Sequence, residues 1–79
     1  MRVVEVLGSG CAKCQYVERL VREVVNEAGI EADVRHVTDY AEIAARGVLA
    51  TPGLAIDGLV VIAGRIPSRE QVATWLGVV

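Results

Sequence analysis

The chain has few aromatic residues, no cluster of positive charge and no long apolar stretch, and each shortage excludes a class of function. Phenylalanine is absent, and one tryptophan and two tyrosines are too few and too scattered to build a base-stacking platform. The net charge is −2 and no run of Lys and Arg occurs, which argues against nucleic acid or an anionic membrane as the main partner. No segment approaches the length of a membrane-spanning helix. We therefore expect no nucleic-acid and no membrane partner.

The 79 residues are enough for one small domain, which we expect to cover residues 1–79. Hydrophobic residues make up 53% of the chain, which indicates a globular protein. The first seven residues already read as a strand that Arg2 and Glu5 interrupt, so we expect no signal peptide and a cytoplasmic monomer. In that reducing compartment, a lone pair of cysteines is more often catalytic, redox-sensing or metal-binding than structural.

The only two cysteines, Cys11 and Cys14, follow a short apolar strand and begin a helix. A disulfide across two intervening residues closes little chain, so a purely structural role is the poorer interpretation. The unpaired N–H groups and the dipole at a helix N-terminus favour a thiolate. We therefore interpret Cys11 as the nucleophile and Cys14, one turn further on the apolar side, as the resolving thiol. Lys13, the only lysine, either adds positive charge that tunes the thiols or is an ordinary solvated side chain.

Hydrophobic periodicity predicts alternating strands and helices. A strand at 3–7 precedes a helix that ends at about residue 28, and a strand at 31–37 precedes a short helix that ends at about residue 46. Asp57-Gly58 between two apolar runs predicts a hairpin, and a capping box from Ser68 begins the last helix. The predicted fold class is α/β, in the order βαβαββα, with a four-stranded mixed sheet of order 2-1-3-4 and helices on both faces.

His36, the sole histidine, falls within the predicted strand at 31–37. A histidine can serve as a general base or a metal ligand, but no partner for it stands nearby in the sequence. We interpret it as an ordinary strand residue.

Three segments together resemble the small thioredoxin/glutaredoxin-like redox-active disulfide proteins of archaea and bacteria. They are Gly8-Ser9-Gly10-Cys11-Ala12-Lys13-Cys14, Thr51-Pro52-Gly53-Leu54-Ala55-Ile56-Asp57-Gly58 and Gly64-Arg65. The resemblance covers essentially the whole chain. It implies a minimal thioredoxin-like fold and a thiol–disulfide oxidoreductase, an electron carrier without a cofactor of its own. The implied partners are protein disulfide substrates and a flavin-dependent disulfide reductase as electron donor.

The resemblance also implies roles for individual residues. Pro52 is expected to be a cis-proline beside the dithiol, and Thr51 to offer its backbone to an extended substrate segment. Glu5 stands six residues before Cys11, the offset at which thioredoxins carry a buried acid that assists proton transfer. The same residue could equally be a carboxylate at a sheet edge or near a helix cap.

Two features depart from the better-known relatives. Gly10 replaces the tryptophan, and Ala12-Lys13 replace the Gly-Pro, of the thioredoxin-type Trp-Cys-Gly-Pro-Cys motif, so the redox potential does not carry over. The region after Gly64 lacks the Gly-Gly-Asp pattern by which glutaredoxins hold glutathione, which argues against glutathione as the donor.

Other functions also use such a pair of cysteines. Small metallochaperones place Cys-x-x-Cys between a first strand and a first helix, and two thiolates suit Cu(I), but those domains lack this Thr-Pro and end on a strand. A regulatory or arsenic-related thiol module would use the dithiol to sense oxidant or to receive electrons for a dedicated partner. A tetrahedral zinc site is disfavoured because two cysteines and one distant histidine fall short of four ligands. We therefore assign no metal ligands.

Overall fold

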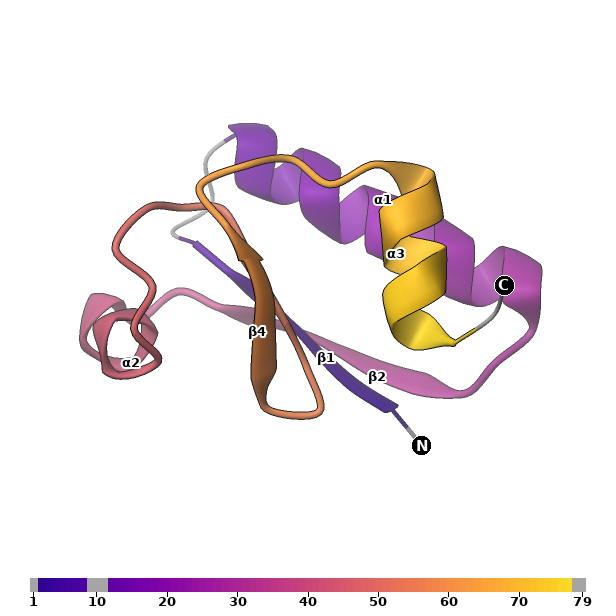
Figure 1. The fold of residues 1–79 in the computed structure, drawn as a ribbon, viewed down its shortest axis with the longest axis horizontal. Coiled ribbons are helices and arrows are strands. Elements are labelled where there is room, and N and C mark those ends of the chain that lie inside the picture. Colours follow the sequence, from indigo (N-terminus) through magenta and orange to yellow (C-terminus); the bar gives the residue numbers. More distant parts are fainter. Residues whose placement is uncertain (1, 9–11, 78–79) are drawn as a thin grey trace.

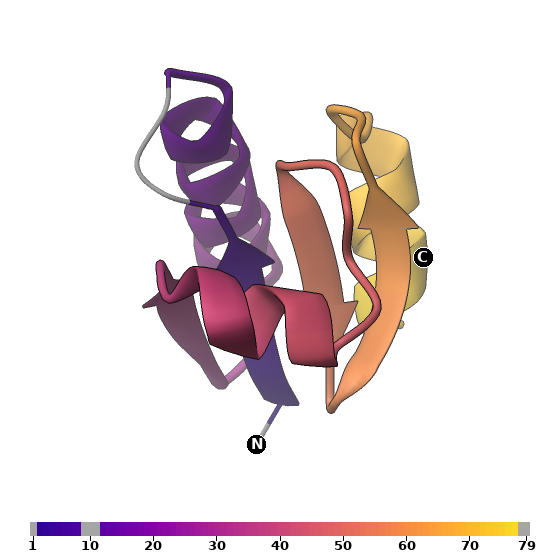
Figure 2. The same ribbon diagram turned by 90° about the vertical axis from the view of Figure 1, so that its left-hand side faces the viewer.

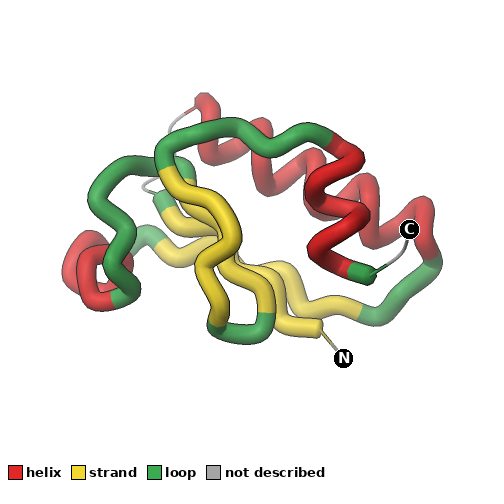
Figure 3. Tube along the Cα trace, viewed as in Figure 1, coloured by secondary structure: helices red, strands yellow, loops and turns green. Residues whose placement is uncertain are grey.

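The computed structural model describes residues 2–8 and 12–77. Three helices and four strands follow one another in these residues in the predicted order βαβαββα (Figures 1 and 3). They are β1 (Arg2–Leu7), α1 (Ala12–Ala28), β2 (Ala32–Val37), α2 (Tyr40–Ala45), β3 (Gly53–Ile56), β4 (Leu59–Ala63) and α3 (Arg69–Leu76). Within the described ranges, no helix is both long enough and apolar enough to cross a membrane.

The four strands form one mixed sheet of order β2-β1-β3-β4, which confirms the predicted topology. β1 runs parallel to β2 and antiparallel to β3, and β3 and β4 form an antiparallel hairpin. The C-terminal end of β1, the start of β3 and the end of β4 therefore lie at the same end of the sheet. α1 also begins at this end (Figure 2). This topology brings the start of the dithiol helix and the Thr51-Pro52 turn to the same end of the molecule.

Short-range signals in the sequence account for the turn and the helix cap. Asp57 and Gly58 form the hairpin turn with φ angles of 53° and 86°, in the left-handed region that glycine and aspartate tolerate best. The Ser68 hydroxyl accepts from the N–H of Gln71 at 3.1 Å, and the Gln71 side chain accepts from the N–H of Ser68 at 2.9 Å. This reciprocal pair is the predicted capping box, and it begins α3.

The alternating side chains of β1 divide the core between the two faces of the sheet. Val4 and Val6 pack with apolar side chains of α1 and α3 in the larger cluster, which includes Leu54 of β3. Leu7 packs on the other face, in a smaller cluster with Ile43 of α2. Each fully buried valine or leucine stabilises the fold by about 1.5–3 kcal/mol. Helices thus cover both faces, as predicted, and α1 carries the candidate site (Figure 1).

Candidate functional site

Cys14 lies in the first turn of α1, and its side chain is fully buried, with 0% exposure. Cys11, the other member of the predicted dithiol, lies outside the described residues. A buried thiol is shielded from direct contact with a protein substrate. This is the property that a resolving cysteine needs.

Gly8 follows β1 and packs directly against the Cys14 side chain. A Cβ atom at Gly8 would overlap Sγ of Cys14 and would lie 3.5 Å from Cβ of Thr51. The Gly8 N–H donates to the carbonyl of Val37 at 2.9 Å, which extends the contact between the first two strands by one residue. Sequence reasoning treats Gly8 only as a break after the strand, whereas the structure shows that the missing side chain makes room for the buried sulfur.

The Thr51–Pro52 peptide bond is cis, the geometry that the resemblance implies. Thr51 is exposed and Pro52 is buried. The Pro52 carbonyl accepts from the N–H of Gly64 at 2.9 Å, which joins this turn to the loop after β4. Because a Cβ at Gly8 would reach both Cys14 and Thr51, these two sequence-predicted residues lie on either side of the same glycine.

We expect a Gly8→Ala substitution to lower the free energy of unfolding by about 2 kcal/mol, in the middle of the range for overpacking a core. The added methyl group overlaps Sγ of Cys14 and lies 3.3 Å from its Cβ, and because this side chain is fully buried it has little room to turn, so the backbone has to shift. Urea denaturation at pH 7 measures the change. A Gly8→Ala, Cys14→Ala double variant should recover most of the loss, because it removes the sulfur. If the double variant recovers nothing, this steric contact is not the cause.

Lys13 lies in the same first turn of α1, with its side chain exposed to solvent. From that position its charge acts on a thiol only through an attraction that water and salt screen.

Glu5 lies on β1, an interior strand, and is only 9% exposed. Its two carboxylate oxygens accept hydrogen bonds from the two terminal nitrogens of Arg46, each at 2.7 Å. These bonds, with the positive charges of Arg46 and Arg35, lower the pKa of Glu5 from its ordinary value of 4.5, although burial alone would raise it. Because Arg46 is the C-terminal cap residue of α2, the pair joins α2 to the sheet. Glu5 is thus held ionised, whereas an acid that transfers protons near neutral pH needs a raised pKa.

His36 on β2 makes two contacts that its sequence neighbourhood does not indicate. Its Nε2 lies 2.8 Å from the carbonyl oxygen of Gly8, and its Nδ1 lies 3.1 Å from Oε1 of Glu18 on α1. The parallel register places His36 opposite Val6, two residues before Gly8. Gly8 stands 28 positions from His36 in the chain, so no short-range pattern could predict the contact.

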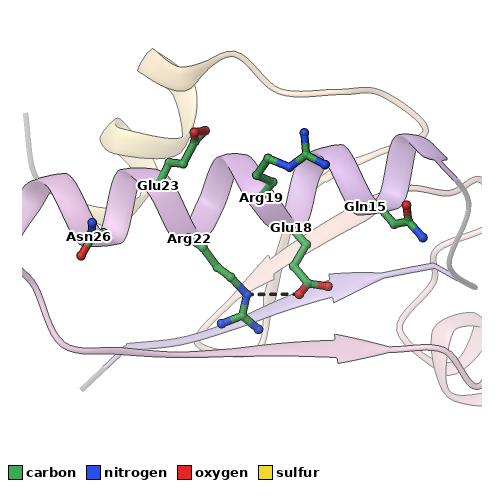
Figure 4. A pocket seen from close by; sticks show the side chains of 6 residues that line it. All are labelled: Gln15, Glu18, Arg19, Arg22, Glu23 and Asn26. Atoms are coloured by element: carbon green, nitrogen blue, oxygen red, sulfur yellow. Dashed lines mark hydrogen bonds and ion pairs between the residues drawn. The ribbon is translucent and has the colours of Figure 1, made fainter.

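The outer face of α1 carries a shallow hollow that polar side chains line (Figure 4). The lining residues are Gln15, Glu18, Arg19, Arg22, Glu23 and Asn26. They belong to the solvated side of the helix, where Glu18 accepts from Nε of Arg22 at 3.1 Å. Among the residues that the structure describes, no group of three or more His, Cys, Asp or Glu side chains could hold a metal ion.

Known proteins resemble this chain along nearly its whole length. The family model described as a thioredoxin domain matches residues 2–77. A thioredoxin of Methanothermobacter thermautotrophicus is 40% identical over 72 residues, which cover 91% of this chain and 94% of that protein. A thioredoxin of Methanocaldococcus jannaschii is 43% identical over 72 residues, which cover 91% of this chain and 83% of that protein. The family match includes both the dithiol segment and the Thr51-Pro52 turn.

Proposed function

Because the chain belongs to the thioredoxin domain family, we propose that it is a thiol–disulfide oxidoreductase in which Cys11 and Cys14 exchange electrons with protein disulfides. The observation that carries this proposal is the position of Cys14. Its sulfur is buried at the start of α1, against the Gly8 backbone, and Gly8 in turn adjoins the exposed Thr51. The proposed resolving thiol thus lies near the exposed Thr51, whose backbone is proposed to meet the substrate.

The proposed reaction transfers two electrons in two exchange steps. The Cys11 thiolate attacks one sulfur of the substrate disulfide, the substrate S–S bond breaks, and the departing substrate thiolate takes up a proton. The Cys14 thiolate then attacks the Cys11 sulfur of this mixed disulfide, which releases the second substrate thiol and leaves Cys11 and Cys14 oxidised to a disulfide. We propose a flavin-dependent disulfide reductase as the donor that returns two electrons to the pair.

Thr51 is proposed to bind the substrate through its backbone, beside Pro52. An extended segment that pairs with backbone atoms gains main-chain hydrogen bonds without the need for a particular side chain, which suits varied protein substrates. Leu49, which is 94% exposed, and Ile66 add apolar surface in the loops on either side of this turn. Such surface would contact the substrate around its disulfide.

We propose a modest tuning role for Lys13 and a structural role for Glu5. The positive charge of Lys13 in the first turn of α1 favours thiolates, and screening by water keeps its effect small. Glu5, ionised and paired with Arg46, holds α2 to β1 and has no proton to give at neutral pH. The proton-transfer role that the resemblance suggests for Glu5 is therefore not part of the proposed mechanism.

A redox titration of the metal-free chain, joined with an assay of insulin disulfide reduction, tests this function. The chain is equilibrated in dithiol buffers of graded potential, and its oxidised fraction is measured by alkylation and mass spectrometry. We expect one two-electron transition, with a tenfold change in the equilibrium ratio for every 30 mV or so. We also expect insulin reduction that the chain loses when both cysteines are alkylated. Very tight Cu(I) binding with negligible insulin reduction would contradict the proposal and favour a soft-metal carrier.

A further inference from the structure

His36 contacts the two segments that hold the Cys14 sulfur in place. Its Nε2 lies 2.8 Å from the Gly8 carbonyl oxygen, and its Nδ1 lies 3.1 Å from Oε1 of Glu18. The side chains of His36 and Glu18 are only about one quarter exposed, at 25% and 26%. Their contact is therefore partly sheltered from water, and no step of the proposed reaction uses the ring.

Both atoms that face the ring are hydrogen-bond acceptors. A backbone carbonyl has no proton to donate, and a carboxylate only accepts. The second oxygen of Glu18, Oε2, accepts from Nε of Arg22 (Figure 4), so each oxygen of this carboxylate faces a nitrogen donor. A neutral imidazole carries one N–H, whereas the imidazolium carries two. Both contacts of His36 are therefore favourable together only when each ring nitrogen carries a proton, the state in which Nε2 donates to Gly8 and the ring forms an ion pair with Glu18.

We propose that the His36 imidazolium is a positioning residue for the dithiol, holding the Gly8 carbonyl through one N–H while its other N–H binds Glu18 on α1. Gly8 is the residue whose backbone packs against the Cys14 sulfur, and Cys14 belongs to α1. The ring thus joins the backbone that faces the sulfur to the helix that carries it. The expected effect of His36 on the rate of disulfide exchange rests on the proposed function. Its expected effect on the Gly8 backbone does not.

Loss of one ring proton is incompatible with this arrangement. Whichever nitrogen keeps its proton, the other presents a lone pair to an oxygen at 2.8 or 3.1 Å, so two acceptors face each other. The positioning therefore depends on both ring protons being present, and a comparison of pH 5.5 with pH 8 tests that dependence.

Among the residues that the structure describes, the charged groups that contact the ring or its partner come from α1. They are Glu18 and its partner Arg22. The neighbouring strand β1 presents Val6 opposite His36. Side chains alternate between the two faces along each strand, so the charged residues near the Val6–His36 pair point to the opposite face of the sheet. These residues are Glu5, Asp33 and Arg35. The carboxylate of Glu18 is therefore the charged group that contacts the ring.

The test compares the wild-type chain with His36→Leu and Glu18→Ala variants at pH 5.5 and pH 8. Arg22→Gln is the matched control, because Arg22 links α1 to β2 through Glu18 and the carbonyl of Val34 without a contact to Gly8. One readout is hydrogen–deuterium exchange of the Gly8 amide, which is bonded to Val37. The other is the rate of insulin reduction. Each is expressed as the ratio of variant to wild type at the same pH.

At pH 5.5 we expect His36→Leu to exchange the Gly8 amide about fivefold faster, and to reduce insulin about fivefold more slowly, than wild type, the effect of one lost hydrogen bond. Both ratios should approach one at pH 8. Glu18→Ala should act in the opposite sense at pH 8, with exchange of the Gly8 amide about fivefold slower than in wild type. A neutral ring has one N–H, and without the Glu18 carboxylate that N–H can stay on the Gly8 carbonyl. Arg22→Gln should leave both ratios near one at either pH.

Ratios that do not change with pH would overturn the role of His36, and so would an Arg22→Gln variant that behaves like His36→Leu. The Glu18→Ala arm decides the question alone if His36→Leu does not fold. Wild-type chain that reduces no insulin at either pH would refute the proposed function, while the Gly8 exchange ratios would still decide whether His36 positions Gly8.

Discussion

A Cys14→Ser variant is expected to stop after the first exchange step and to accumulate a mixed disulfide between Cys11 and its substrate. A serine hydroxyl cannot attack a disulfide, so the second step has to wait for a thiol from solution. The built-in thiol has a far higher effective concentration than an external one, so we expect the rate of insulin reduction to fall by at least about 100-fold. Mass spectrometry under non-reducing conditions detects the accumulated species.

A Cys11→Ser variant is the matched control for this experiment. Because Cys14 is fully buried, it should not replace Cys11 as the attacking thiol, so this variant should be inactive without a mixed disulfide. The assignment of nucleophile and resolving thiol is reversed if Cys11→Ser forms the mixed disulfide and Cys14→Ser does not. Thermal melting of both variants checks that either substitution leaves the fold intact.

An Arg46→Leu variant is expected to lose about 2 kcal/mol of unfolding free energy at pH 7, between the values for a surface ion pair and a fully buried one, because the Arg46 side chain is 25% exposed. Arg46 supplies both of the 2.7 Å hydrogen bonds to Glu5, and its removal leaves a carboxylate with 9% exposure without them. Leucine keeps part of the apolar contact of the arginine stem, so the loss reports mainly on the charge. Urea denaturation measures it.

This stabilisation should depend on pH in a direction that the lowered pKa of Glu5 determines. A carboxyl group with a lower pKa in the folded state stabilises the fold above its unfolded value, here 4.5, and that contribution is lost as pH falls through the folded pKa. The difference between wild type and Arg46→Leu should therefore be constant above about pH 5.5 and shrink as pH falls below 4.5. A difference that stays constant down to pH 3 would contradict the pairing.

Two controls separate the buried pair from ordinary surface charge. A Glu5→Gln, Arg46→Leu double variant should recover part of the loss, because it no longer buries an unpaired charge. Arg69→Leu breaks the ion pairs with Glu23 and Glu27 between α3 and α1, whose side chains are about half exposed or more. We expect that variant to lose at most about 1 kcal/mol.

The order of strands and helices could be predicted from the sequence because each element follows its own short-range signals. The apolar run of β1, the Asp57-Gly58 turn and the capping box from Ser68 each involve residues a few positions apart. The nearness of Thr51-Pro52 to Cys14 depends on long-range contacts, and it could be expected only through the resemblance to a known family.

Glu5 and His36 show where this kind of prediction ends. The offset of Glu5 from Cys11 suggests either proton transfer or a structural carboxylate, and only the long-range pairing with Arg46, which lowers the pKa of Glu5, favours the structural role. The lone His36 suggests an ordinary strand residue, but the register of β2 against β1 brings its ring to Gly8 and Glu18.

The sequence by itself determined the succession of elements and the placement of Cys14 in the first turn of a helix, since these depend on neighbours within a turn or two. Only the tertiary structure decided which backbone lies against the Cys14 sulfur, which cation meets Glu5 and which oxygens face His36. These contacts join residues 28 positions apart for His36 and Gly8, and 41 apart for Glu5 and Arg46. They form only when the strand register and the packing of the helices on the sheet bring those residues together.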